Sequence, residues 1–252
     1  MIEVQDVVKK FAGVTAVDGV SFEVPRGQVV GFLGPNGAGK STTMRILTGF
    51  FPPTEGKVSV DGVDVLREPL EARRRMGYLP ESVPLYREMR VIEYLDYRAR
   101  LKGVRRPDRR RRLDEAIARC GLDGVRRKMI GHLSKGYRQR VGIADVVVHD
   151  PPVLVLDEPT VGLDPAQIRD IRELVRDLGS SRTVLLSTHI MQEVEMVCDR
   201  VLILVRGRIA LDRSMSEFQR PDAAALEETF LKILASDPAE VGAPAPSAEG
   251  AA

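Results

Sequence analysis

Short apolar runs rich in β-branched residues recur along the chain, and each predicts a strand. The runs are Val20–Val24, Gln28–Leu33, Lys57–Val60, Val153–Leu156, Thr183–Ser187 and Val201–Val205. Several are continuously apolar rather than alternating, which is typical of strands whose sheet is covered on both faces. The pattern therefore predicts an α/β core.

Between about residues 85 and 150 the apolar spacing changes to that of helices. Ile92, Leu95 and Ala99, for example, share one helical face. We therefore predict a helical insertion that interrupts the sheet. Residues 236–252 consist mainly of Ala, Pro, Gly and Ser. Because such a segment buries too little apolar surface to offset the entropy of ordering, we predict a disordered tail.

Composition limits the class of protein. The 252 residues fit one domain. No apolar run approaches the roughly 20 residues that cross a bilayer, and the N-terminus lacks the apolar core of a secretory signal, so we expect a cytoplasmic chain. Cys120 and Cys198 stand apart from each other and from any His cluster, which predicts buried reduced thiols rather than a zinc site or a disulfide.

Charge gives no indication of a nucleic-acid partner. The net charge is +2, so the chain has no overall field that would favour nucleic acid or a membrane surface. Six arginines lie within residues 105–112, just before an amphipathic helix whose apolar residues lie elsewhere. We interpret them as a solvated face and expect no nucleic acid to bind.

A glycine-rich loop follows the predicted strand at Gln28–Leu33 and precedes a helical run. Glycine lets consecutive backbone N–H groups turn inward around an anion, and the helix adds its positive N-terminal end. Lys40 can reach the β- and γ-phosphates of ATP, and the Ser41 hydroxyl can ligand Mg²⁺. The predicted phosphate site comprises Gly34, Pro35, Asn36, Gly37, Ala38, Gly39, Lys40, Ser41 and Thr42.

Two carboxylates follow the buried run Val153–Leu156 directly, at the edge of the sheet where ligands bind. Asp157 is positioned to hold Mg²⁺ through water, and Glu158 to orient the water that attacks the γ-phosphate. The alternative is that both acids only cap the next helix. The phosphate loop in the same chain favours the metal and catalytic roles.

A second anion site is predicted at LSKGYRQR, Leu133–Arg140, where the Ser134 hydroxyl stands at a helix N-terminus. VLVLDEP, GLDP at residues 162–165 and STHI at residues 187–190 follow it in order. With the phosphate loop, these segments make the chain resemble the ABC-type ATPases over about residues 2–235. The resemblance implies one ABC ATP-binding domain, residues 1–235. It would have a P-loop NTPase core, an N-terminal antiparallel β subdomain and an inserted α-helical subdomain at about 85–150.

The resemblance also assigns roles to single residues. In a head-to-tail dimer that holds two ATP molecules, Ser134 and Gly136 of one subunit complete the site of the other. His189 matches the residue that contacts the γ-phosphate, although a lone His is often structural. Phe11, in KKF ahead of the first long strand, matches the aromatic residue on which adenine stacks; the alternative is a core position.

Two positions depart from the family pattern. Glu81 stands where the family has a Gln that reaches the metal and the attacking water. A carboxylate still suits Mg²⁺, so Glu81 is a predicted metal ligand together with Ser41 and Asp157. Tyr137 stands where the signature usually has Gln. These features, with LEETFLKI at residues 226–233, resemble the drug-exporter and gliding-motility branch.

The predicted function is therefore to bind and hydrolyse ATP as a subunit of an ABC transporter. Such a chain works on the inner face of the membrane, as a homodimer or with a close relative, and drives a separate permease, with export favoured. One alternative is a soluble ABC ATPase in cofactor assembly. Another is a nucleotide-gated regulator that barely hydrolyses ATP, which the Glu81 substitution keeps open.

Overall fold

The computed structural model describes residues 1–220 and 224–235, so the tail predicted at 236–252 lies outside the described residues. The strands of its larger sheet are β3 Val29–Leu33, β6 Met76–Leu79, β7 Val153–Asp157, β8 Thr183–Thr188, β9 Arg200–Val205 and β10 Arg208–Ser214. Their order is β10-β9-β3-β8-β7-β6. All neighbouring pairs are parallel except β10 with β9.

The larger sheet is covered on both faces. Every residue of β3, β7 and β8 is buried, which explains why most positions in these strands are apolar and do not alternate with polar ones. Val29 and Leu33 of β3 pack among helices, whereas Val30 and Phe32 pack against a second sheet. The predicted α/β core is confirmed.

The second sheet is antiparallel, in the order β2-β1-β4-β5. Its strands are β1 Ile2–Phe11, β2 Val14–Val24, β4 Glu55–Val60 and β5 Val63–Asp64. Strand β1 escaped the sequence analysis because its register shifts between Val4 and Val7, where Asp6 has a φ of 46°. Such a bulge breaks the alternation that identifies a strand.

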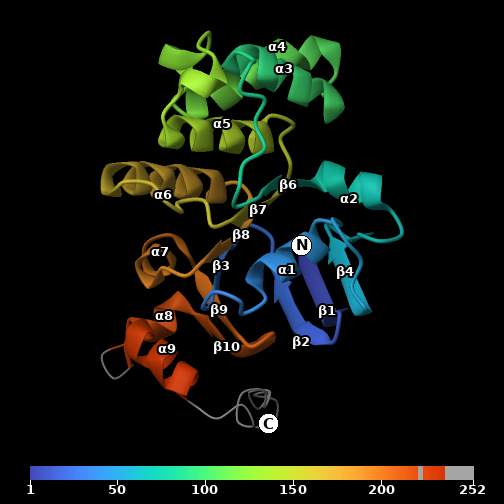
Figure 1. Ribbon diagram of the computed structural model, residues 1–252, viewed down its shortest axis with the longest axis vertical. Coiled ribbons are helices and arrows are strands. Elements are labelled where there is room, and N and C mark those ends of the chain that lie inside the picture. The colour runs from blue at the N-terminus through green and yellow to red at the C-terminus, as the bar shows by residue number, and fades with distance from the viewer. Residues whose placement is uncertain (221–223, 236–252) are drawn as a thin grey trace, which may run out of the picture.

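Helices cover the sheets and extend the molecule at one end. They are α1 Lys40–Leu47, α2 Pro69–Arg75, α3 Val91–Leu101, α4 Arg106–Arg119, α5 Lys135–Val147, α6 Pro165–Gly179, α7 Met191–Val197, α8 Met215–Phe218 and α9 Leu226–Ala235. Helices α3 and α4 pack on α5 at the end farthest from α9 (Figure 1). Leu95 and Ala99 are buried there, as their helical spacing predicts.

Two expectations about side chains can be compared with the structure. Both cysteines are free and buried, as predicted, and burial raises the pKa of Cys120 to about 12. The solvated arginine face holds for Arg111, but Arg109 and Arg112 are only 21% and 28% exposed. They pair with Asp96 and Asp150, because α4 packs too closely on its neighbours for its whole surface to remain in water.

Among the described residues, no helix combines the length and the apolar character needed to span a membrane. Three loops decide the chemistry instead. One joins β3 to α1, one follows β7, and one follows β8. All three leave the carboxyl ends of parallel strands, so the sheet itself brings them together.

Candidate nucleotide site

The loop between β3 and α1 is held tightly against the protein backbone. A Cβ on Gly34 would lie 2.3 Å from the carbonyl oxygen of Leu204, and one on Gly39 would lie 2.5 Å from that of Ala16. Gly39 also has a φ of 105°, which side chains disfavour. Packing against the backbone therefore requires glycine at both positions. This requirement is separate from the space that an anion in the loop would need.

Lys40 begins α1 and folds back into this loop. Its Nζ donates hydrogen bonds to the carbonyl oxygens of Gly34 at 2.7 Å and Pro35 at 3.2 Å. Nζ also lies 3.5 Å from Oε1 of Glu158, and both side chains are less than one tenth exposed. A buried ammonium needs such compensation, so Glu158 balances the charge of Lys40 in this state.

Asp157 ends β7 and is 1% exposed. Its Oδ1 accepts hydrogen bonds from the hydroxyls of Ser187 at 2.6 Å and Ser41 at 3.2 Å. Hard oxygen donors of this kind suit Mg²⁺. The described residues contain no group of three or more His, Cys, Asp or Glu that could hold a metal, so a Mg²⁺ ion here would take its remaining ligands from phosphates and water.

Glu158 has an unusual backbone for a residue other than glycine, with a φ of 49°. This conformation costs on the order of 1 kcal/mol. It persists because the Glu158 N–H donates to the backbone oxygen and the hydroxyl of Ser187, at 3.2 Å and 3.0 Å. The strained turn directs the carboxylate towards His189, whose Nδ1 lies 2.8 Å from Oε2.

Lys40, Ser41, Glu158 and His189 meet at one cleft of about 380 Å³, whereas Asp157, Gly34 and Pro35 are not among the residues that line it. Residues 36–42 line it, together with Ala16, Glu81, Glu158, Val161 and His189. Glu81 is exposed and follows β6. The cleft therefore combines backbone N–H groups, a lysine, a glutamate and a histidine, as binding and hydrolysis of a phosphate ester require.

Phe11 is among neither the core residues nor the residues that line this cleft. Phe11 is the last residue of β1. The sequence analysis placed it ahead of the first long strand because that analysis did not recognise β1. Its ring is 43% exposed and meets the ring of Phe51 edge to face at 5.5 Å. The core alternative is wrong, and stacking of adenine on Phe11 stays a prediction.

Ser134 and Gly136 also lie outside the cleft. Ser134 is exposed and caps α5, since its hydroxyl accepts the N–H of Tyr137 at 3.3 Å. Gly136 is buried against Gln167 of α6, whose Oε1 would lie 2.5 Å from a Cβ on it. Within one chain, these two residues do not reach the phosphate loop.

Sequence reasoning overlooked Ser187, which contacts the Asp157 carboxylate and the Glu158 backbone. Its hydroxyl donates to Asp157 and accepts the N–H of Glu158. It also missed Glu193, which is 1% exposed and accepts hydrogen bonds from Thr160 and Thr188 behind the site. The only sequence signal was the place of Ser187 at the end of a buried strand beside His189.

Comparisons with known proteins identify the family of the chain. A family model described as ABC transporter matches residues 17–161, and a model described as an AAA domain, putative AbiEii toxin, matches residues 129–195. The ABC transporter ATP-binding protein NatA of Bacillus subtilis is 37% identical over 83% of this chain and 87% of its own length. The bacitracin transport ATP-binding protein BcrA of Bacillus licheniformis is 36% identical over 83% and 68%.

Solved structures match over nearly the whole fold. An ATP-binding subunit of an ABC transporter superposes with a TM-score of 0.83 at 32% identity, covering 93% of this chain and 99% of that chain. The ATP-binding cassette MJ0796, in a dimeric post-hydrolysis state bound to ADP and Pi, gives 0.77 at 25% identity, covering 85% and 99%. The fold is thus the predicted ABC ATPase fold, and the chain belongs to the ABC transporter family as an ATP-binding, ATP-hydrolysing subunit.

Proposed function

We propose that this chain works as an ATP-driven head-to-tail dimer that powers export through a separate permease. The main support for the proposal is that the predicted site residues lie in two separate places on the chain. Lys40, Glu158 and His189 meet in one cleft, whereas Ser134 lies exposed at the start of α5, outside it. A second copy can supply what the cleft lacks.

Lys40 and Glu158 exchange partners when ATP binds. The phosphates take the Lys40 ammonium, which otherwise lies 3.5 Å from Glu158 and donates to the loop carbonyls. Glu158 is then free to accept a proton from the attacking water, while His189, 2.8 Å away, keeps its carboxylate in position. Ser41 and Asp157 would hold Mg²⁺, with Glu81 at the rim of the cleft; the ion supplies positive charge that offsets the phosphates.

ATP drives closure only if it binds the closed dimer more tightly than the open one. The exposed Ser134 hydroxyl and the first N–H groups of α5 offer that extra affinity to the γ-phosphate of a partner. The dimeric relative bound to ADP and Pi supports this arrangement. A homodimer satisfies it, as does a dimer with a close relative.

A groove of about 570 Å³ offers a docking surface for the permease. Phe50, Leu70 and Leu101 line it and are 73%, 70% and 60% exposed. The described residues that line it include four cations and no acid; the cations are Arg73, Arg74, Arg98 and Lys102. Arg98 and Lys102 pair with Asp145, and Arg74 pairs with Glu71, so Arg73 is the cation that no carboxylate of the described residues neutralises. Such a surface suits an amphipathic segment of the permease that carries apolar side chains and a carboxylate.

Leu70→Glu should weaken binding of the permease by about tenfold to a hundredfold, because one apolar anchor is lost and a like charge meets the incoming carboxylate. Leu70 is the second residue of α2, where a glutamate favours the helix, so folding should be preserved. Co-purification from membranes measures the effect, with Leu231→Glu on α9 as the matched control. Equal retention of a polytopic membrane protein by both variants would exclude this groove.

The relative described as a bacitracin transport ATP-binding protein supports a role in transport, and the resemblance of the signature segments to the drug-exporter branch favours export. Cells with the chain and its permease should accumulate less of the cargo than cells with an inactive variant. Greater accumulation would indicate import. Co-purification with soluble proteins alone would favour the alternative role in cofactor assembly.

Glu81→Gln should retain ATPase activity but require about fivefold more Mg²⁺ for half-maximal rate, since one charge near the ion is worth on the order of 1 kcal/mol in an exposed site. Glu81→Ala should lose hydrolysis. The measurement is ATPase rate against free Mg²⁺ at fixed ATP. Glu88→Gln, on an exposed glutamate outside the cleft, is the control. Coincident curves for wild type and Glu81→Gln would show that Glu81 does not reach the metal.

A further inference from the structure

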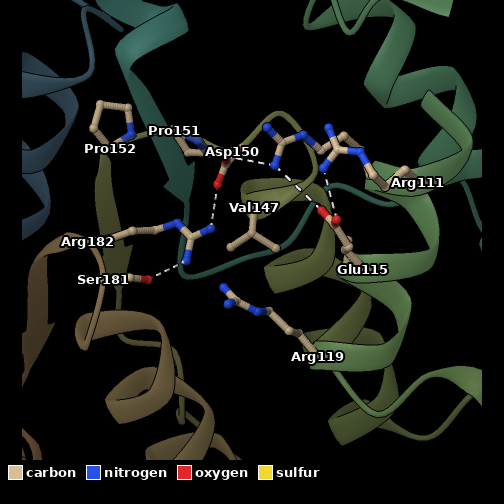
Figure 2. Close-up of a pocket in the computed structure, with 11 residues that line it drawn as sticks. Arg111, Glu115, Arg119, Val147, Asp150, Pro151, Pro152, Ser181 and Arg182 are labelled. Atoms are coloured by element: carbon tan, nitrogen blue, oxygen red, sulfur yellow. Dashed lines mark hydrogen bonds and ion pairs between the residues drawn. The ribbon is translucent and has the colours of Figure 1, made fainter. Parts of the chain in front are cut away.

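A cavity of about 630 Å³ (Figure 2) lies where β7 and β8 of the larger sheet begin, whereas the nucleotide cleft lies where these strands end. Pro151 and Pro152 line it just before β7 begins, and Ser181 and Arg182 line it just before β8 begins. Helix α4 forms the other wall. The cavity thus joins three segments that are distant in the sequence, and none of its residues belongs to the nucleotide cleft.

Its lining is strongly cationic. Arg111, Arg112 and Arg119 of α4 line it. Figure 2 shows Arg182 on the wall opposite Arg111 and Arg119. Two acids, Glu115 and Asp150, also line the cavity. Four guanidinium groups against two carboxylates leave two positive charges in excess among the described lining residues. This excess matches a phosphate monoester, which carries about −1.5 to −2 at neutral pH.

Asp150 organises two of the arginines. It accepts hydrogen bonds or ion pairs from Arg182 at 2.6 Å and Arg112 at 2.7 Å. The Arg182 side chain is only 10% exposed, and its Nε has no hydrogen-bond partner among the described residues. That Nε is itself buried and does not face the cavity. Arg182 is held in place by Asp150 and by the Ser181 hydroxyl, which accepts from its Nη1 at 3.2 Å, so little side-chain entropy is lost when its remaining Nη hydrogens bind a ligand.

Arg119 differs from the other three arginines. It has no ion pair and no hydrogen bond from its side chain within the described part of the chain, and Figure 2 shows it directed into the cavity below Val147. Ala116, Val147 and the two prolines add an apolar surface beside the arginines. A ligand with an anionic end and an apolar body would therefore meet complementary groups at both ends.

We propose that this cavity binds a phosphorylated small molecule. The planar guanidinium forks of Arg119 and Arg182 match the oxygens of a phosphate group, with the Ser181 hydroxyl beside them, and the organic part of the ligand lies on Val147 and the prolines. The volume is in the range of known small-molecule sites. The site is separate from ATP hydrolysis and stands whether or not the proposed transport function does.

The test uses phenyl phosphate as the probe and a Lys40→Ala background, which disables the phosphate loop. A protein-observed NMR titration should show one saturable site per chain. Arg119→Gln should weaken binding about tenfold, because one charged hydrogen bond is lost. Glu115→Gln should strengthen it severalfold, because a carboxylate that repels the anion is removed and Arg111 keeps only the more distant Asp108, at 3.6 Å instead of 2.9 Å, as an acidic partner. Phenyl sulfate, with a single negative charge, should bind more weakly than phenyl phosphate.

Arg127→Gln removes the same charge from an exposed arginine outside the cavity and should leave affinity unchanged. If Arg127→Gln weakened binding as much as Arg119→Gln, the loss of affinity would come from the change in net charge alone, and the proposal would be overturned. So would the absence of saturable binding in the millimolar range. Weakening by Arg110→Gln instead of Arg119→Gln would move the anion to the opposite face of α4, where Arg110 lines a smaller hollow. That result would also overturn the assignment.

Discussion

Lys40→Ala is expected to weaken MgATP binding by at least about a hundredfold, because two charge-assisted contacts to the β- and γ-phosphates are lost and each is worth about 1.5–3 kcal/mol. The site contains no nearby replacement. Lys40 is 5% exposed and is held over the loop by the carbonyl oxygens of Gly34 and Pro35, a position that no neighbouring cation shares among the described residues that line the cleft.

Equilibrium binding of a fluorescent ATP analogue with Mg²⁺ measures the effect. Lys128→Ala removes an exposed lysine far from the cleft and serves as the matched control. Near-normal affinity of the Lys40→Ala protein would contradict the assignment of the phosphate loop. Because the substitution also leaves the buried Glu158 without its cation, a lower melting temperature without ATP should accompany the loss of binding.

The sequence predicted the elements whose pattern has one simple physical cause. Strands β3 and β7 are covered on both faces, so the residues of β3 and residues 153–156 of β7 form continuous runs without charged side chains, and these runs are evident in the sequence. Strand β1 has a bulge at Asp6, and the local pattern of apolar residues therefore fails. Tertiary pairing with β2 and β4 stabilises it, which no local window of sequence contains.

The features of the site also fall into those that local sequence predicts and those that depend on tertiary structure. The glycine loop and the two carboxylates after β7 are recognisable because each has a local sequence context. The contacts of Glu158 with Lys40 and His189 depend on the order of β3, β8 and β7 in the sheet. Ser187 was overlooked because a serine at the end of a strand is unremarkable until parallel pairing sets it opposite Asp157.

The arginine-rich stretch shows the limit of composition as evidence. Its charges suggested only a solvated face. In the structure, however, Arg112 of α4 and Arg182 before β8 both pair with Asp150 before β7. The run Arg105–Arg112 contains no information about which arginine meets which acid. That depends on where α4 lies against the loops before β7 and β8.

Glu158→Gln should reduce ATP hydrolysis by about a hundredfold to ten-thousandfold, the range expected when a general base is removed. The amide has the shape of the carboxylate, so the strained turn at Glu158 and the N–H bonds to Ser187 remain. ATP binding should persist, because Lys40 and the loop are unchanged. With MgATP, the variant should therefore accumulate as a dimer on size-exclusion chromatography, since closure proceeds and hydrolysis does not reopen it.

Adding Ser134→Arg to Glu158→Gln should return the protein to a monomer that still binds ATP, because a bulky cation at the start of α5 blocks the surface that a partner's nucleotide must approach. Ser216→Arg makes the same change at an exposed serine of α8 and should leave the trapped dimer intact. If Ser134→Arg instead abolished ATP binding by the monomer, the α5 terminus would act on its own chain's nucleotide. Since Ser134 lies outside the cleft that holds Lys40 and Glu158, we expect dimerisation alone to be lost.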